Sequence, residues 1–494
     1  MADFTWTPEQ ELIFDEVLAR NPDGSPTNPF IKIEAVAGAS KTTTLVEIAA
    51  RLKAANPQST FRYLVFGNAN ASEARTSFAT TAICSTLHSL AYYEIITKKR
   101  FNLNSTIVPF ITWRDIPKSI RIPFGKTSTT IDIVTQYCNS TALSFGSFES
   151  ELEDNHELLP FVRQIVNGMA TGLIKPTHDF YLKLFHDGLV NGTIIPDTVD
   201  TLALDEAGDL TPITINVFGA YPAHQRIMVG DDAQAIFYFM GCKNGFTHFS
   251  NVGKTLHLTQ SFRVSAPIAE KVQAFCNNTF APNMKFEGMH YSSISTTTEA
   301  YITRTNSALI EHMIGLNRTN TPYRLITPGK LKQLFKYPLF LLGSEPNRTV
   351  YEHELKGVQH TINDWFNLSE QEQAKQGMFS YIREHNEDNP NIASAITLIL
   401  KYGPKSIIDA YNSADAHLHS SANLCLTTAH SVKGMTFDVV TISDDLNNSI
   451  EDIMLQYKHI DNYKPTAELL AELKLYYVAV TRCRHVLNNA KYIV

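Results

Sequence analysis

The stretch that decides the fold is A-V-A-G-A-S-K-T-T-T-L, residues 35–45. It overlaps a short, mostly apolar run, residues 31–36, that is typical of a buried strand. It leads into residues 42–52, where apolar side chains recur at helical spacing. Small residues followed by a lysine, Lys41, lie between the two. The pattern predicts a strand, a tight loop and a helix that begins near the lysine.

The loop resembles a P-loop, which binds phosphate groups. In a P-loop, backbone N–H groups surround the phosphates, a lysine reaches the β- and γ-phosphates, and the next hydroxyl binds Mg²⁺. The usual pattern has glycine at both ends, whereas this chain has Ala35 and Ser40. For this segment alone, an ordinary strand-to-helix turn therefore remains the alternative. The expected nucleotide contacts are Gly38, Ala39, Ser40, Lys41, Thr42 and Thr43.

A second motif, L-A-L-D-E-A-G-D at residues 202–209, places two carboxylates at the end of another apolar run. Asp205 can hold Mg²⁺ through water, and Glu206 can orient and deprotonate an attacking water molecule. Acidic turns at strand ends are common, but together with Lys41 this pair indicates ATP hydrolysis. ATP and Mg²⁺ are therefore the expected cofactors, with Thr42 and Asp205 as the metal-binding residues.

A third motif, residues 227–241, reads I-M-V-G-D-D-A-Q-A-I-F-Y-F-M-G. It places Gln234 in a loop after a strand, where the amide can sense a γ-phosphate. Phe237 and Phe239 follow as candidate base-stacking surfaces. Because an F-x-F pair is more often part of a core, the stacking role depends on the other motifs.

Composition limits the class of protein. The 494 residues are 44% hydrophobic and 18% charged, which is typical of a globular chain with two to four domains. Because the net charge is −7, any nucleic-acid site must be a local groove. Six scattered cysteines without a C-x-x-C pair argue against a zinc site and favour a reducing compartment. We expect no signal peptide and no membrane segment.

Strands that end in small or acidic residues and alternate with helices predict an α/β fold with parallel sheets, which bind ligands at the carboxyl ends of their strands. Helix-rich stretches interrupt this pattern at residues 148–167, 179–185 and 330–419. We therefore expect two α/β cores, each with a mostly helical insertion. Further strands of the first core are expected at residues 61–66, 82–85, 201–204 and 226–229, and the second core near residues 255–277, 300–313, 423–443 and 467–486.

The order of these motifs resembles that of UvrD-like superfamily 1 helicases over nearly the whole chain. The resemblance implies two RecA-like P-loop motor domains. The first comprises residues 1–93 and 196–252, with residues 94–195 as its insertion. The second comprises residues 253–329 and 420–494, with residues 330–419 as its insertion.

The resemblance also implies nucleotide contacts beyond the loop. Gln10 stands where the family has an adenine-reading glutamine. The motif L-T-Q-S-F-R, residues 258–263, resembles one whose phenylalanine stacks on adenine and whose arginine reaches the γ-phosphate. The motif Y-V-A-V-T-R, residues 477–482, resembles another whose arginine contacts the γ-phosphate. These contacts are Gln10, Phe262, Arg263, Gly434, Thr436 and Arg482. The implied catalytic residues are Lys41, Asp205, Glu206, Gln234, Arg263 and Arg482.

Other motifs resemble the family's contacts to single-stranded DNA. They are F-G-N-A-N at residues 66–70, T-L-H-S-L-A-Y at residues 86–92 and T-A-H-S-V-K-G-M-T-F at residues 428–437. For the two histidines a buried, satisfied side chain is the alternative. For the basic residues 98–100 the favoured interpretation is a solvated charged face. The candidate DNA-binding residues are Phe66, Asn68, Thr86, His88, Phe237, Phe239, Thr428 and His430.

The implied function is an ATP-dependent helicase or translocase that moves 3′ to 5′ on single-stranded DNA. It would act at junctions with duplex DNA in replication, recombination or repair, with proteins of those processes as partners and no membrane contact. T-H-D-F-Y-L-K-L-F at residues 177–185 is similar to the F-box helicase branch, although no F-box-like segment precedes the loop. The size suits a viral or bacterial relative. The expected compartment is the cytoplasm, or the nucleus in a eukaryote.

Four departures from the family pattern put nucleotide affinity or coupling to DNA in question. They are Ser40, Gly208, Met240 and Thr436. A non-catalytic DNA-binding or scaffolding protein, derived from a helicase, is therefore the alternative function. Retention of the charged motif residues argues against it, because a decayed site loses such groups first.

Overall fold

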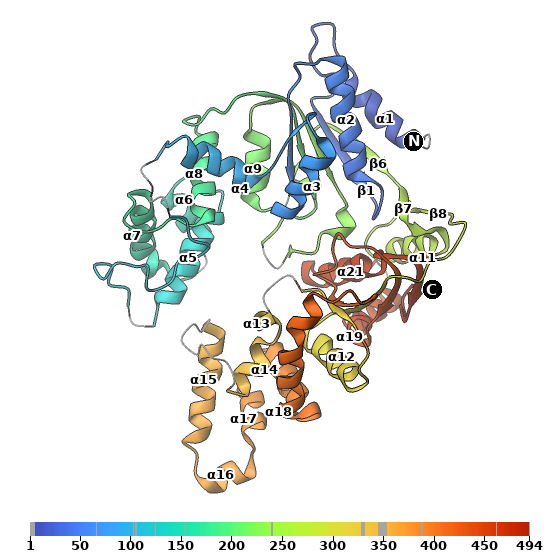
Figure 1. Ribbon diagram of the computed structural model, residues 1–494. Coiled ribbons are helices and arrows are strands. Elements are labelled where there is room, and N and C mark those ends of the chain that lie inside the picture. Colours follow the sequence, from blue (N-terminus) through green and yellow to red (C-terminus); the bar gives the residue numbers. More distant parts are fainter. Residues whose placement is uncertain are drawn as a thin grey trace. The chain divides into compact units, whose positions relative to one another are not determined.

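The computed structural model describes residues 5–65, 67–101, 103, 106–123, 125–152, 154–238, 241–327, 331–343, 353–386, 389–460 and 462–493. They form two compact units, Met1–Ser261 and Phe262–Val494, which we describe one at a time (Figure 1). Each unit has a parallel sheet with helices, a form that is compatible with RecA-like domains. Among the described helices, none has both the length and the apolar character needed to span a bilayer.

The first unit is built on a six-stranded sheet in which all neighbouring strands are parallel. The five strands that the sequence predicts for this core are confirmed, with ends shifted by at most three residues. Their carboxyl ends therefore meet at one edge of the sheet. In spatial order the strands are β3 (Ile83–Thr86), β2 (Phe61–Val65), β4 (Val199–Leu204), β5 (Ala223–Gly230), β1 (Phe30–Ala35) and β6 (Lys254–Leu258).

One of these strands corrects the sequence analysis. Residues 254–258, which we expect in the second core, form β6 and pair with β1 in the first sheet. Leu256 lies opposite Ile33 and Leu258 opposite Ala35, and all four side chains are buried. Burial of these apolar pairs explains why the strand belongs to the first sheet.

Helices connect the strands of the first unit. α1 (Pro8–Leu18) starts at a capping box, because the Thr7 and Gln10 side chains each accept a hydrogen bond from the other's backbone N–H. α2 (Lys41–Ala55) follows β1 and buries Leu45, Ile48 and Leu52. The other helices are α3 (Asn68–Phe78), α4 (Leu87–Tyr92), the π-helix that continues it (Tyr93–Thr97), α9 (Pro212–Ala220) and α10 (Gly245–His248).

A helical insertion with its own apolar core lies between β3 and β4, as predicted. Residues 148–167, however, are not one helical stretch. One helix ends at Glu151, where the break begins, a short 3-10 turn starts at His156, and Pro160 stands in the first turn of the following helix. A proline is tolerated there but disrupts a helix interior, which explains the break. The helices are α5 (Thr127–Asn139), α6 (Phe145–Glu151), α7 (Leu159–Ala170) and α8 (His178–Val190).

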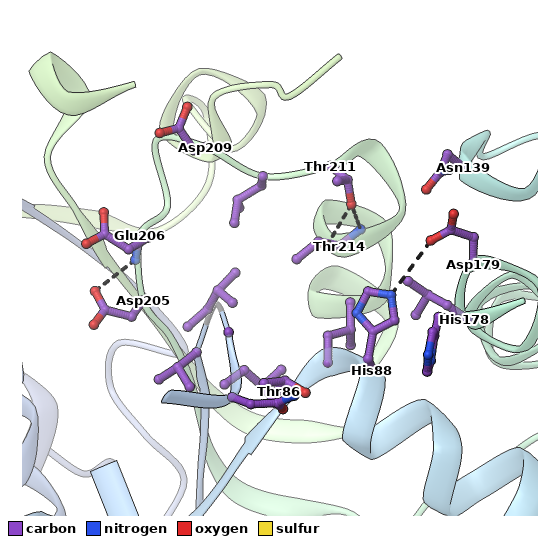
Figure 2. Close-up of a pocket in the computed structure, with 18 residues that line it drawn as sticks. Thr86, His88, Asn139, His178, Asp179, Asp205, Glu206, Asp209, Thr211 and Thr214 are labelled. Atoms are coloured by element: carbon purple, nitrogen blue, oxygen red, sulfur yellow. Dashed lines mark hydrogen bonds and ion pairs between the residues drawn. The ribbon is translucent and has the colours of Figure 1, made fainter. Parts of the chain in front are cut away.

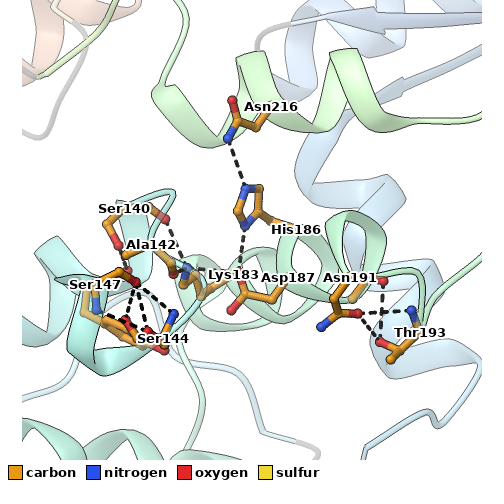
Figure 3. Close-up of polar contacts among 12 residues, drawn as sticks. Ser140, Ala142, Ser144, Ser147, Lys183, His186, Asp187, Asn191, Thr193 and Asn216 are labelled. Atoms are coloured by element: carbon orange, nitrogen blue, oxygen red, sulfur yellow. Dashed lines mark hydrogen bonds and ion pairs between the residues drawn. The ribbon is translucent and has the colours of Figure 1, made fainter.

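A buried polar chain fastens this insertion to the sheet-bearing part of the first unit (Figure 3). Lys183 on α8 is 1% exposed, and its Nζ donates to the Ser140 carbonyl at 3.2 Å and to Asp187 Oδ1 at 2.9 Å. Asp187 also bonds His186, whose Nε2 lies 3.5 Å from Asn216 Nδ2 on α9. A buried ammonium without such partners is costly, so breaking these contacts is unfavourable. The contacts therefore hold α8 between α5 and α9.

The second unit has a five-stranded sheet that is also parallel throughout. The predicted elements near residues 300–313, 423–443 and 467–486 are confirmed. The order is β10 (Arg324–Leu325), β11 (Leu424–Thr428), β9 (Glu299–Thr303), β12 (Phe437–Ile442) and β13 (Cys483–Asn488), while β7 (Gln260–Ser265) pairs with β8 (Glu287–Met289). The helices are α11 (Ala266–Asn277), α12 (Asn306–Arg318), α19 (Asp444–Asn448), α20 (Glu451–His459) and α21 (Ala467–Val480).

The chain between β10 and β11 is mostly helical where it is described, as predicted for the second insertion. Its last helix is interrupted at Gly403, which has a φ of 79° and precedes Pro404. The division into four parts at residues 93, 195, 252, 329 and 419 stays a prediction. The helices are α13 (Leu331–Leu334), α14 (Lys336–Leu341), α15 (His353–Phe366), α16 (Glu370–Lys375), α17 (Met378–Glu384) and α18 (Pro390–Leu418).

Candidate active site

The sequence motifs of the first unit meet at one edge of its sheet. Lys41 follows β1, Asp205 and Glu206 follow β4, and Gln234 follows β5. Because these strands are parallel, residues after their carboxyl ends lie close together. Lys41 Nζ lies 3.8 Å from Glu206 Oε1. This ion pair joins the first motif to the second.

The loop between β1 and α2 is shaped by left-handed backbone. Gly38 has a φ of 78° and Ser40 a φ of 56°, and α2 begins at Lys41 directly after them. Ser261 Oγ fixes the loop by donating to the Ala37 carbonyl at 2.7 Å. The Ser40 side chain makes no capping hydrogen bond at the start of α2. The first N–H groups of α2 are therefore suited to an anionic phosphate.

Two departures from the family pattern, Ser40 and Gly208, differ in how well each residue fits its local backbone. Ser40 holds a left-handed conformation that costs a residue with a side chain about 1–2 kcal/mol. Gly208 fits its place closely, because a Cβ atom added there would lie 3.0 Å from the Asp231 carbonyl oxygen. A glutamine at position 208 would therefore require the loop after β5 to move.

Asp205 is held by its neighbours in the sheet. Tyr63 Oη donates to Asp205 Oδ2 at 2.5 Å, and the Glu206 N–H donates to Oδ1 at 2.8 Å. Burial raises the pKa of Asp205 and the Glu206 carboxylate raises it further, while Lys41 opposes the shift. Burial, together with Asp205, also raises the pKa of Tyr63, so the phenol remains a donor. A hard dication such as Mg²⁺ suits this oxygen-rich, negatively charged site.

The predicted nucleotide contacts of the first unit differ in exposure. Lys41 is half-buried, and Thr42 and Thr43 are exposed in the first turn of α2, whereas Ala39 is buried. Gln10 is fully buried, and its Nε2 donates to Thr44 Oγ1 at 2.9 Å. The Gln10 amide therefore bonds within the protein, and its contact with adenine stays a prediction.

Gln234 lies in a buried turn that is linked to the acidic loop. Its Nε2 donates to Asp231 Oδ2 at 2.6 Å, and Asp231 Oδ1 accepts from the Ala233 N–H at 3.0 Å. Asp209, from the loop after β4, accepts from the Phe237 N–H at 2.9 Å. These contacts couple the position of the acidic loop to that of Gln234. The Phe237 side chain is half-buried, while Phe239 and Met240 lie outside the described residues.

A cavity of about 460 Å³ at this edge brings predicted DNA contacts near the acids (Figure 2). The His88 side chain is 47% exposed, and its Nε2 lies 3.8 Å from Asp179 Oδ1. Its exposure argues against the alternative of a buried histidine. Thr86 is buried and accepts from the Ser89 N–H at the start of α4. The cavity lining includes Asn68, Thr86, His88, Asp205 and Glu206, while Phe66 lies outside the described residues.

The basic residues 98–100 are partly neutralised. Lys98 Nζ lies 2.8 Å and Arg100 Nη2 3.0 Å from the buried carboxylate of Glu94, which is part of the π-helix. All three basic residues are exposed, as the favoured interpretation of a solvated charged face requires, although two of them are ion-paired. Glu94 was not a predicted partner, although its i+4 spacing to Lys98 was a usable signal, whereas the i+6 contact with Arg100 has no such pattern.

Predicted DNA contacts also lie at the carboxyl edge of the second sheet, around a cavity of about 630 Å³. Arg304, which follows β9, binds Glu472 of α21 through Nε–Oε2 and Nη2–Oε1 contacts of 2.7 and 2.6 Å. The cavity is otherwise lined mainly by neutral groups. They include Thr305, Asn306, Ser307, Asn391, Thr428 and Ser431, with the His430 ring nearby.

The remaining nucleotide candidates belong to the second unit. Arg482 is only 1% exposed, and its Nε donates to the Val478 carbonyl at 2.9 Å. A shared site between these residues and Lys41 stays a prediction. Phe262 and Arg263 lie half-buried on β7, and exposed Gly434 and half-buried Thr436 precede β12.

Three residues at the first edge were missed by the sequence analysis. Tyr63 lies in register with Ala203, so Asp205, two residues further on, is on the same face of the sheet. Because side chains two residues apart on a strand share a face, the sequence offered a usable signal for Tyr63. Asp231 stood in the third motif without a role, and its bond to Gln234 could have been considered. The support that Asp209 gives to the Phe237 backbone has no signal in the sequence.

Comparisons with known proteins give distant relatives. No protein-family model matches the chain. It is 25% identical to "F-box DNA helicase protein 1" of Schizosaccharomyces pombe, over 98% of this chain and 57% of that protein. It is 24% identical to "F-box DNA helicase 1" of Gallus gallus, over 98% of this chain and 49% of that protein. The chain thus spans about half the length of these relatives. The likeness supports a relationship to the superfamily 1 helicases.

Proposed function

We propose that this chain is an ATP-dependent DNA helicase or translocase of the UvrD-like type, which moves 3′ to 5′ on single-stranded DNA. The observation that carries the proposal is the meeting of Lys41 with Glu206, beside Asp205, at the carboxyl edge of a parallel sheet. A cation at the start of a helix and two acids after a neighbouring strand suit the hydrolysis of a phosphoanhydride. The names of the two distant relatives support DNA as the substrate.

In this proposal each charged group has one task. Lys41 binds the β- and γ-phosphates, and its ion pair with Glu206 opens when the nucleotide enters. Thr42 and Asp205 would hold Mg²⁺, which would neutralise charge on the phosphates. Glu206 orients the attacking water and accepts its proton. Gln234 reports the presence of the γ-phosphate to the loop that carries Phe237.

We further propose that Arg263 and Arg482 of the second unit contact the γ-phosphate. Two such charge-assisted contacts would favour closure of the motor domains, and hydrolysis would release them. Replication, recombination or repair is the proposed setting, at junctions of single-stranded and duplex DNA. Both named relatives come from eukaryotes, which favours the nucleus among the two compartments considered.

A non-catalytic DNA-binding protein is the second candidate. Two observations favour it: Ser40 is strained where the family pattern has glycine, and the Gln10 amide is engaged within the protein. The two candidates differ in one measurable property, because only the motor turns over ATP.

The test measures ATP hydrolysis with and without an unstructured oligonucleotide, for the native chain, Lys41→Ala and the control Lys53→Ala. Lys53 lies on the same helix, α2, and its Nζ donates to the Ser59 carbonyl. We expect DNA-stimulated turnover in the native chain and the control, and none in Lys41→Ala. Absence of stimulated turnover in the native chain would rule out the motor. Unwinding only from a 5′ tail would refute the proposed direction.

A further inference from the structure

Residues 98–126 differ sharply in charge from the rest of the chain. They contain seven lysines and arginines but one acid, Asp115, and therefore carry a net charge of +6. Since the whole chain carries −7, the other residues together carry −13. A segment this basic in an acidic protein is a local site for a polyanion.

Four of the seven cations have no counter-ion among the described residues, while Lys126 Nζ lies 3.8 Å from Glu157 Oε1. The Asp115 carboxylate accepts from the Thr112 N–H and hydroxyl at 2.9 and 2.6 Å, so it serves a local turn. Lys98 and Arg100 share the single carboxylate of Glu94, which offsets one of their two charges. Among the described residues, no carboxylate lies within ion-pair distance of the other exposed cations up to residue 121. These are Lys99, Arg114, Lys118 and Arg121.

Two aromatic rings are exposed in the same segment. Phe110 is 63% and Trp113 is 64% exposed, while Ile111 between them is buried in the core of the insertion. The Arg114 guanidinium lies 5.2 Å from the centroid of the Trp113 ring. Ile116, Ile120 and Ile122 pack against the same core, so isoleucines anchor the segment. Large aromatic rings are usually buried, because burial removes their apolar surface from water. Rings that stay exposed beside cations therefore indicate a binding surface.

We propose that residues 110–121 bind single-stranded DNA, with bases stacked on Phe110 and Trp113 and phosphates bound by Arg114, Lys118 and Arg121. The proposal rests on the proposed function and adds a strand contact outside the helicase-like motifs. Unpaired bases are favoured over duplex because only they offer an open face to an aromatic ring. An acidic protein segment would satisfy the cations but has no equivalent partner for the rings.

Trp113 provides a direct probe of stacking. The chain has three tryptophans, and the other two, Trp6 and Trp365, are half-buried. In a Trp6→Phe, Trp365→Phe background, we expect an oligothymidine of about 20 nucleotides to quench Trp113 fluorescence without any nucleotide cofactor. Unchanged emission with bound oligothymidine would overturn the proposal. Quenching by oligoglutamate but not by oligothymidine would also overturn it and would indicate an acidic protein partner.

Affinity measurements separate the rings from the charges. We expect Trp113→Ala to weaken oligothymidine binding about tenfold, and the exposed control Phe366→Ala to leave it unchanged. Arg114→Gln with Lys118→Gln and Arg121→Gln should reduce the slope of log affinity against log salt by about 2. The matched control changes three exposed lysines of the second unit to glutamine, Lys285, Lys375 and Lys405.

The binding result is independent of the motor. Affinity is measured without ATP, and basal ATP turnover is expected to stay unchanged in every variant of this segment. If the variants bind like their controls, the surface is refuted while ATP turnover still supports the proposed function. If the native chain lacks ATP turnover but loses affinity on Trp113→Ala, the surface stands and the motor does not.

Discussion

Both sheets end in a cavity at their carboxyl edge, and the two cavities differ in charge. The first cavity contains four carboxylates, those of Asp179, Asp205, Glu206 and Asp209. The second contains one, Glu472, and Arg304 binds it through two contacts. A cluster of four carboxylates repels a phosphate backbone unless a metal ion intervenes, whereas hydroxyls and amides accept it. We therefore expect metal-dependent chemistry at the first edge and strand contact at the second.

The largest effect that follows from this contrast is the loss of turnover in Asp205→Asn. The amide keeps the shape but removes the charge that would hold Mg²⁺, so we expect ATP turnover to fall about 100-fold or more. Steady-state hydrolysis across a range of Mg²⁺ concentrations measures this. Asp415→Asn, an exposed site in the second unit, is the control. Full activity of Asp205→Asn at ordinary Mg²⁺ would contradict a metal role at the first edge.

The Asp205 carboxyl should also make the stability of the chain depend on pH. Because the pKa of Asp205 is raised in the folded chain, the folded state binds this proton more tightly than the unfolded state does. Without Mg²⁺, the native chain therefore loses stability as pH rises from about 4 through the folded pKa. We expect Asp205→Asn to unfold at higher denaturant concentration than the native chain at pH 7, with the difference shrinking towards pH 4. An equal difference at both pH values would refute this.

A smaller effect is expected on the affinity for single-stranded DNA, where the histidines of the two cavities should differ. We expect His430→Ala to weaken binding of single-stranded DNA about fivefold, because it lines the cavity with neutral groups. His88 lies near four carboxylates and pairs with Asp179, so His88→Ala should change affinity less than about twofold without Mg²⁺. Fluorescence anisotropy with a labelled oligonucleotide measures both. The reverse ranking would show that charge does not separate the two edges.

The Tyr63 hydroxyl should affect how tightly the first edge binds Mg²⁺. Tyr63→Phe removes the 2.5 Å bond to Asp205, and this bond lowers the pKa of Asp205. We expect the Mg²⁺ concentration for half-maximal turnover to rise about threefold, with little change at saturation. Tyr323→Phe, which removes a buried hydroxyl bonded to Asn317 in the second unit, is the matched control. An equal change in both variants would point to a general loss of stability.

The smallest expected effect is at Ser40. Ser40→Gly relieves the cost of a left-handed residue with a side chain, and part of that gain is offset by the flexibility of glycine in the unfolded chain. We expect the free energy of unfolding to rise by about 0.5–1 kcal/mol. Ser40→Ala should give no gain, since alanine also has a Cβ atom. Denaturant unfolding of both variants tests this.

Much of the first edge could be predicted because its signals are local. A strand ending in small residues before Lys41, and another ending in Asp205 and Glu206, place both motifs at one edge once the sheet is parallel. The strand β6 was misplaced, because its five residues alone do not indicate which sheet they join. The Lys183–Ser140 bond and the Arg304–Glu472 pair join residues far apart in sequence, so no local pattern reveals them.

ATP hydrolysis by Glu206→Gln, in the presence of saturating single-stranded DNA, tests most directly whether the first edge carries out the chemistry. If Glu206 is the general base, the variant should bind ATP at least as well as the native chain while its turnover falls about 100-fold or more. Glu472→Gln, which alters the single carboxylate of the second cavity, should keep turnover within about threefold of the native value. Turnover by Glu206→Gln within a few-fold of the native chain would contradict the assignment of chemistry to the first edge.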